Sequence, residues 1–176
     1  SEALPRLRVL RLQRVPYLRT CLSKNCARST LTQLFASPLI PRLEGLHLHG
    51  QLDEASLKAL IDAPFKRLKS LDLGNMKRPL QHFAKLGHAP WMKRLEHFGL
   101  PNSIVHQAAW SELLDALGRP SKMRSLDLSR SSLCKEDLSP TFARRGWYGL
   151  TSLRLDRCPL TDASVQALAA PKDMYN

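Results

Sequence analysis

The stretch LTSLRLDRCPLTDASVQALA, residues 150–169, changes its hydrophobic period partway along its length. Its first part, Leu150-x-x-Leu153-x-Leu155, alternates apolar and polar residues, as a strand with one buried face does. Its second part, from Asp162 to Ala169, spaces its apolar residues as a short helix does. The stretch therefore predicts a strand, a turn and a helix in close succession.

The first part of this stretch, which we call the head, recurs upstream at a nearly constant spacing. The steps between the starts of successive heads are 36, 25, 27, 28 and 27 residues. Repetition at such a period is typical of repeat architectures, and the longer first step predicts an insertion within residues 16–30. The six heads are Leu7-Leu10-Leu12, Leu43-Leu46-Leu48, Leu68-Leu71-Leu73, Leu95-Phe98-Leu100, Met123-Leu126-Leu128 and Leu150-Leu153-Leu155.

The residues between the heads have helical spacing. In LKALIDA, residues 57–63, Leu57, Leu60 and Ile61 share one helix face. Prolines that precede several heads help to end these helices, and either Asp162 or Thr161 is expected to cap the last one. The predicted helical segments are 31–36, 57–63, 80–86, 106–117 and 162–170.

A unit made of one strand and one helix cannot bury its apolar faces alone, so successive units must stack. Stacking places the strands in one parallel sheet and the helices on its opposite side. Because a helix is wider than the strand spacing of about 4.8 Å, the stack must curve, with the sheet on the concave face and the helices on the convex face. We therefore expect an α/β fold, a curved solenoid of about six repeats that forms a single domain over residues 1–176.

The heads resemble leucine-rich repeats, and the resemblance covers nearly the whole chain. The period of 25–28 residues and the helical segments between the heads are similar to those of the ribonuclease-inhibitor-like class of that family. Residues 150–169 also resemble its bacterial-type repeats. This resemblance implies a horseshoe-shaped scaffold for protein recognition. The sequence departs from the family at the ninth position of the repeat, where the usual Asn or Cys is matched only by Cys158. The other five units carry Val15, Gln51, Met76, Ser103 and Ser131 at that position.

Composition narrows the class of protein further. The chain has 176 residues and a net charge of +12, from 27 basic and 15 acidic residues, which raises its affinity for phosphates and acidic proteins. Four cysteines without a Cys-x-x-Cys pair are too sparse for a disulfide scaffold, so we expect a cytoplasmic protein. No apolar stretch is long enough for a membrane span. Neither end shows the polar capping unit that a solenoid usually needs, so we expect either a fragment of a longer protein or ends that something else covers.

The residues that alternate with the head leucines are expected on the concave face of the sheet. They are mostly small, polar or charged, which suits either a binding surface for a partner protein or a merely solvated face. The candidate partner-binding residues are Arg11, Gln13, His47, His49, Ser70, Asp72, His97, Asp127, Ser129, Arg154, Asp156 and Arg157.

A second candidate site lies at the position just before each head, where five of the six residues are basic. Stacking should align them along one edge of the sheet, where they could bind a polyanion, either a nucleic acid or an acidic protein. They could equally be solvated loop residues with extended apolar stems. This basic edge stripe comprises Arg6, Arg42, Arg67, Arg94 and Lys122.

Residue types that carry catalysis or bind metals form no recognisable motif. His47, His49 and Asp72 are zinc-compatible, but residues two apart on a strand lie about 6.6 Å from each other, which makes closure around one ion awkward. We therefore expect no metal site, no cofactor and no enzymatic activity. Cys158 is expected to pack as a small apolar residue in its turn, and a disulfide with Cys134 stays open as an alternative.

Overall fold

The computed structural model describes residues 7–15, 26–50, 52–78, 80–117, 122–135, 138–142 and 149–169. Within these ranges, only the backbone is described for residues 13–15, 26–30, 117, 134–135 and 140. Arg6 and most of the expected insertion lie outside the described residues.

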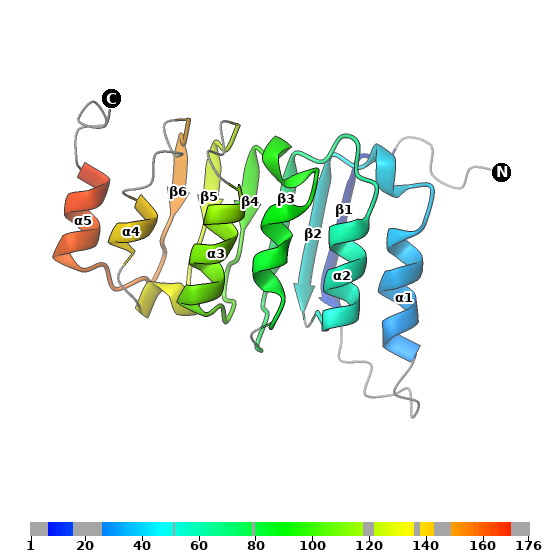
Figure 1. The fold of residues 1–176 in the computed structure, drawn as a ribbon, viewed down its shortest axis with the longest axis horizontal. Coiled ribbons are helices and arrows are strands. Elements are labelled where there is room, and N and C mark those ends of the chain that lie inside the picture. The colour runs from blue at the N-terminus through cyan, green and yellow to red at the C-terminus, as the bar shows by residue number, and fades with distance from the viewer. Residues whose placement is uncertain are drawn as a thin grey trace.

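One strand follows the start of each head, and the six strands form a single parallel sheet in chain order (Figure 1). The register pairs Leu46 with Leu71, and Phe98 with Leu126, so equivalent head positions lie side by side. The six parallel strands and their alignment confirm the α/β fold that the heads predict. The strands are β1 (Val9–Val15), β2 (Gly45–Gly50), β3 (Ser70–Gly74), β4 (His97–Gly99), β5 (Ser125–Asp127) and β6 (Ser152–Arg154).

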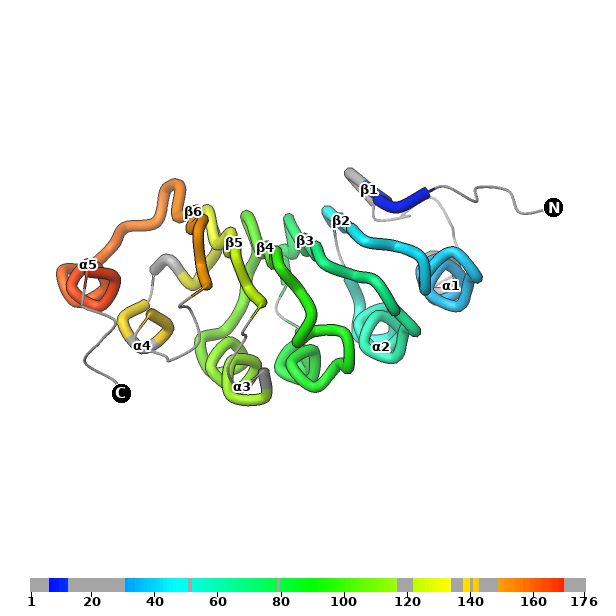
Figure 2. The backbone as a smooth tube through the Cα atoms, turned by 90° about the horizontal axis from the view of Figure 1, so that it is seen from above, coloured from blue at the N-terminus to red at the C-terminus, as the bar shows by residue number. Residues whose placement is uncertain are grey.

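The helices all lie on one side of this sheet, as Figure 2 shows from above. The α-helices are α1 (Cys26–Phe35), α2 (Glu54–Asp62), α3 (Gln107–Leu117), α4 (Ser139–Phe142) and α5 (Asp162–Ala169). The 3-10 helices are η1 (Ile40–Arg42), η2 (Phe83–His88), η3 (Met92–Arg94) and η4 (Ser132–Lys135).

Two helical segments differ from the sequence-based expectation. The helix expected at 31–36 begins earlier, at Cys26, so residues 26–30 of the expected insertion are helical. The segment expected to form a helix at 80–86 adopts the tighter 3-10 form in η2 instead. There Gly87 packs so closely on α3 that a Cβ would lie 2.6 Å from the Leu113 carbonyl oxygen. This close approach leaves no room for a side chain at position 87.

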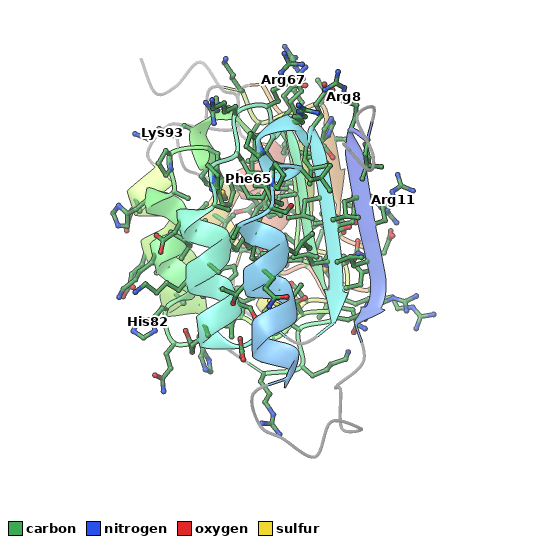
Figure 3. All side chains as sticks on the ribbon, turned by 90° about the vertical axis from the view of Figure 1, so that its right-hand side faces the viewer. Arg8, Arg11, Phe65, Arg67, His82 and Lys93 are labelled. Atoms are coloured by element: carbon green, nitrogen blue, oxygen red, sulfur yellow. The ribbon has the colours of Figure 1, made fainter. Side chains whose placement is uncertain are left out.

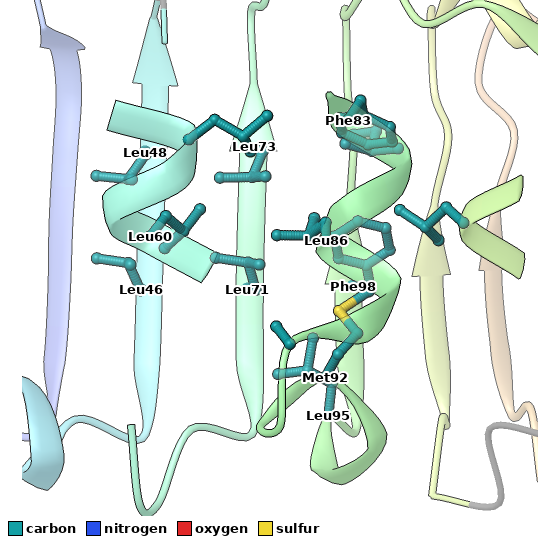
Figure 4. Packing of buried hydrophobic residues seen from close by; sticks show 14 of the residues in the cluster. Leu46, Leu48, Leu60, Leu71, Leu73, Phe83, Leu86, Met92, Leu95 and Phe98 are labelled. Carbon is teal, nitrogen blue, oxygen red and sulfur yellow. The ribbon is translucent and has the colours of Figure 1, made fainter. Parts of the chain in front are cut away.

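The core lies between the sheet and the helix layer (Figure 4). Leu46, Leu71 and Leu73 of the heads are at most 1% exposed, and Leu60 of α2 packs opposite them. Burying one such side chain completely contributes about 1.5–3 kcal/mol to stability. The regular spacing of the heads thus builds one continuous apolar layer along the sheet.

The chain turns away from the sheet at the same repeat position in the units of β2 to β6. The residue seven places after the start of the head has a positive φ in five successive units, which directs the chain away from the strand. Backbone bonds link neighbouring turns, because the Asn75 N–H donates to the Pro101 carbonyl oxygen at 2.9 Å. These turn residues are Gly50 (154°), Asn75 (62°), Asn102 (52°), Arg130 (57°) and Arg157 (59°).

Ser103, at the ninth position of its repeat, bonds to the backbone of the preceding unit. It is 1% exposed, and its hydroxyl lies 3.0 Å from the Leu73 carbonyl oxygen and accepts from the Met76 N–H at 3.2 Å. These contacts satisfy backbone groups of the preceding unit that would otherwise be buried without partners. The Ser103 hydroxyl therefore links the turn of its own unit to the strand and turn of the unit before it.

Cys158, expected to pack as a small apolar residue in its turn, is half-buried and disulfide-bonded in the structure. Its Sγ lies 3.5 Å from the Leu128 carbonyl oxygen, in the place that Ser103 occupies relative to Leu73. The side chains of the other three cysteines lie outside the described residues. Disulfides are rare in the cytosol, so this bond weakens the cysteine-based argument for a cytoplasmic protein.

Helix caps explain where two of the α-helices begin. The Asp53 carboxylate accepts from the Ser56 N–H at 2.8 Å at the start of α2. At the start of α5, Thr161 rather than Asp162 fills this role, because its hydroxyl accepts from the Ser164 N–H at 3.1 Å. Each cap satisfies a helix N–H that has no partner inside the helix.

Candidate functional site

The face of the sheet opposite the helices carries the candidate partner-binding residues. Side chains alternate along each strand, so the residues between the buried leucines point away from the helix layer. Figure 3 shows Arg11 of β1 extending on this side. The register then aligns one row across the sheet, in the order Arg11, His47, Asp72, Gly99, Asp127 and Arg154.

The exposure of the candidate residues is uneven. Ser129 is only 6% exposed, and its hydroxyl accepts from the Asp156 N–H at 3.2 Å, so its side chain is not available on the open surface. The side chain of Gln13 lies outside the described residues. The half-buried candidates are His47, His49, Ser70, Asp72 and Asp127, and the exposed ones are Arg11, His97, Arg154, Asp156 and Arg157.

Two histidines and one carboxylate form a cluster on β2 and β3. The nearest atoms are His49 Nε2 and Asp72 Oδ1, 3.1 Å apart, while His47 Nδ1 lies 3.7 Å from Asp72 Oδ2. Burial lowers the pKa of His47, although the charge of Asp72 opposes this shift, and the positive charge of Arg11 adds to it. The cluster therefore holds a histidine whose neutral form is favoured beside a carboxylate.

A second charged cluster lies on β5, β6 and the turn that follows. Arg154 lies 3.4 Å from Asp127 on the neighbouring strand and 3.0 Å from Asp156 on its own chain segment. The hydrogen bond to Asp156 and the negative charges of Asp127 and Asp156 raise the pKa of Arg154. Because Arg154 is exposed, these pairs can be exchanged for contacts with a partner at a small cost.

This face presents charged and hydrogen-bonding side chains. Among the described residues, no three His, Cys, Asp or Glu side chains are placed to hold a metal ion. His47 and His49 contact Asp72, and in the described part of the chain neither ring bonds to a hydroxyl or a thiol.

The basic edge stripe lies at the end of the sheet where the strands begin. Its described members border two adjoining hollows. The first, which we call the basic hollow, has a volume of about 430 Å³ and is lined by Arg8, Pro41, Arg42, Lys66 and Arg67. The second, which we call the mixed hollow, has a volume of about 260 Å³, and its lining includes Arg94, Lys122, Glu44 and Glu96. Lys66 and Arg67 border both hollows.

The structure adds residues that the repeat position alone does not indicate. Lys66 precedes Arg67 in the sequence FKRLKS, and the pair of adjacent basic residues is the signal that could have revealed it. Arg8 follows the first leucine of its head and joins the same hollow from β1's side. Arg94, in contrast, donates to the Phe65 carbonyl oxygen, which makes it partly a structural residue.

Comparison with protein-family models and with curated proteins found no match to this chain. Within the part of the chain that the structure describes, every helix is too short or too polar to cross a lipid bilayer.

Proposed function

We propose that this chain is a leucine-rich-repeat solenoid of the ribonuclease-inhibitor-like class, and that it binds another protein on the open face of its sheet. The repeat assignment is supported by the alternation of one strand and one helical segment, by the alignment of the head leucines and by the recurrent positive-φ turn. A concave sheet with its helices outside is the form that such stacking favours.

The observation that carries the function is the open row of acidic and basic side chains across the sheet. Asp72 lies beside two histidines of β2, and Asp127 lies 3.4 Å from Arg154 of β6. Because Arg154 is exposed, a partner that presents complementary charges can replace its ion pairs. The role is non-catalytic, because the charged groups contact each other rather than a nucleophile.

Site-directed photocrosslinking tests this proposal. A photoreactive amino acid replaces the exposed His97 on the open face, or the exposed Lys85 on the helix side as a control. We expect a discrete protein adduct in the native lysate from position 97 and none of the same mass from position 85.

Affinity measurements with that purified protein complete the test. Arg11→Glu combined with Arg154→Glu should weaken binding at least tenfold, because two cations of the row reverse their charge. The matched pair Lys58→Glu and Lys85→Glu on the helix side should change binding less than twofold. Equal effects of the two pairs would show that the open face is not the site.

A further inference from the structure

The basic hollow concentrates positive charge at one end of the molecule. Four of its five lining residues are cationic and none is acidic. Figure 3 shows Arg8 and Arg67 at the same end of the molecule, beside the starts of the strands. Cations gathered in a recess raise the local concentration of anions more than the same charges spread over a surface.

These cations are accessible to a ligand. Arg42, Lys66 and Arg67 are exposed, and in the described part of the chain neither Lys66 nor Arg67 forms an ion pair. Arg8 lies 3.8 Å from Glu44, with about half of its side chain exposed (47%). An exposed pair at this distance contributes less than about 1 kcal/mol, so a more strongly charged anion can displace Glu44 from Arg8.

The neighbouring mixed hollow has five cations in its lining, two of them shared with the basic hollow, but it also contains two carboxylates. Glu44 and Glu96 are part of its lining, and Lys69 lies 3.6 Å from Glu96. Arg94 is bonded to the Phe65 carbonyl oxygen. The basic edge stripe is therefore not a uniform track for a long polyanion. The basic hollow differs from the mixed hollow in that its lining contains no carboxylate.

We propose that the basic hollow binds a phosphate monoester, carried by a phosphorylated serine or threonine of a partner protein. Such a group has a charge of about −1.5 to −2 and three acceptor oxygens, which several cations can contact at once. Arginine side chains match phosphate oxygens with two parallel N–H bonds, and three of the four cations here are arginines. A carboxylate has half the charge and one oxygen fewer to share among them.

A nucleic-acid backbone fits the observations less well. A phosphodiester carries one charge per residue and needs cations that continue along the strand, but the carboxylates of the mixed hollow interrupt them. The lining of the basic hollow also contains no aromatic side chain on which an unpaired base could stack.

This inference rests on the proposed function in one respect, because it takes the ligand to be part of a protein. It nevertheless concerns a different surface, at the edge of the sheet. Arg8 lies three residues before Arg11 of the open face, so a bound phosphopeptide could continue onto the row of charges.

Fluorescence anisotropy with a labelled peptide tests the proposal. The probe contains one phosphoserine flanked by glycines and alanines, and the same peptide is made with serine or with glutamate at that position. We expect the phosphopeptide to bind at least tenfold more tightly than either comparison peptide. Arg42→Gln combined with Arg67→Gln should remove this preference, and Arg42→Lys combined with Arg67→Lys should restore only part of it.

The matched control is Lys58→Gln combined with Lys85→Gln, which removes two charges from the helix side and should change affinity less than twofold. The proposal is overturned if the three peptides bind equally, or if the control pair weakens binding as much as the arginine pair does. A 20-base-pair DNA duplex that binds more tightly than the phosphopeptide would also overturn it, in favour of a nucleic-acid backbone. Lys66→Gln serves as a second variant, with a smaller loss expected, if the arginine pair fails to fold.

The two proposals fail separately. If the charge reversals on the open face leave partner binding unchanged, the phosphopeptide measurement still stands, because it uses an isolated peptide and other residues. Absence of phosphopeptide binding likewise leaves the crosslinking result at position 97 unaffected.

Discussion

The middle of the array and its last unit use the same motif with very different burial. Leu71 and Leu73 of β3 are at most 1% exposed, whereas the equivalent Leu153 and Leu155 are only half-buried. The helices differ in the same way. The apolar face of α3 is buried, but Val165 and Leu168 of α5 are 49% and 38% exposed.

This difference shows that the motif alone does not determine burial. A head leucine is fully covered only when a unit lies on each side of it, so stability in such an array is close to a sum over neighbouring pairs. The interior units should therefore carry most of the free energy of unfolding, and the last unit should open more easily.

The largest effect on the free energy of unfolding is expected from truncating a buried head leucine. Leu71→Ala should lower the free energy of unfolding by about 3 kcal/mol, because the side chain is fully buried and leaves a cavity. Leu153→Ala should lower it by only about 1 kcal/mol, because water already reaches that side chain. Urea denaturation followed by circular dichroism measures both values, and equal losses would remove the proposed difference between the units.

A smaller effect is expected at the helix caps. Asp53→Ala removes the cap of α2 and should cost about 1 kcal/mol of global stability. Thr161→Ala removes the cap of α5 and should cost less than half as much in global unfolding, because α5 can open locally. Hydrogen exchange should instead show faster exchange of the α5 amides. A global loss from Thr161→Ala as large as that from Asp53→Ala would indicate that the last unit unfolds together with the interior.

The smallest expected effect depends on pH. Burial lowers the pKa of His47 below its unfolded value, so the unfolded state binds a proton at a higher pH than the folded state does. The free energy of unfolding should therefore fall as pH drops below about 6.5 and should level off below the folded pKa. His47→Gln should flatten this slope, as measured by urea titrations between pH 7.5 and pH 5. Removal of the exposed His106, by His106→Gln, controls for loss of a histidine, and an unaltered slope in His47→Gln would contradict the assignment.

The strands and their order could be predicted from the sequence because leucine spacing reports two things at once. The alternation within each head indicates a strand, and the repetition of the heads indicates which residues become neighbours. Leu46 beside Leu71 follows from spacing alone. The 3-10 form of η2 could not be predicted, because it accompanies the close approach of Gly87 to α3. The short helix α4 has too few apolar residues to show a helical period.

The candidate sites were predictable to a similar degree. Alternation along the strands identifies the row that contains His47 and Asp72. It also predicts that Ser129 is exposed, whereas the packing of neighbouring turns buries this side chain. The repeat position identifies Arg42 and Arg67 as aligned cations. It does not show that Glu96 interrupts the row or that Arg94 is bonded to a carbonyl oxygen. Those features depend on side chains from different units meeting in space.

The recurrent positive-φ turn has a consequence for how this chain can change its length. The turn residue follows the start of its head by seven residues in every unit from Leu43 onward. From each turn residue to the next head, by contrast, the distances are 18, 20, 21 and 20 residues. An added residue on the helix side is thus already tolerated among the units. One added residue between a head and its turn would exchange the two faces of that strand and put leucines into solvent. The segments that form the helix layer can therefore differ in length between units, whereas the segment from each head to its turn keeps the same length.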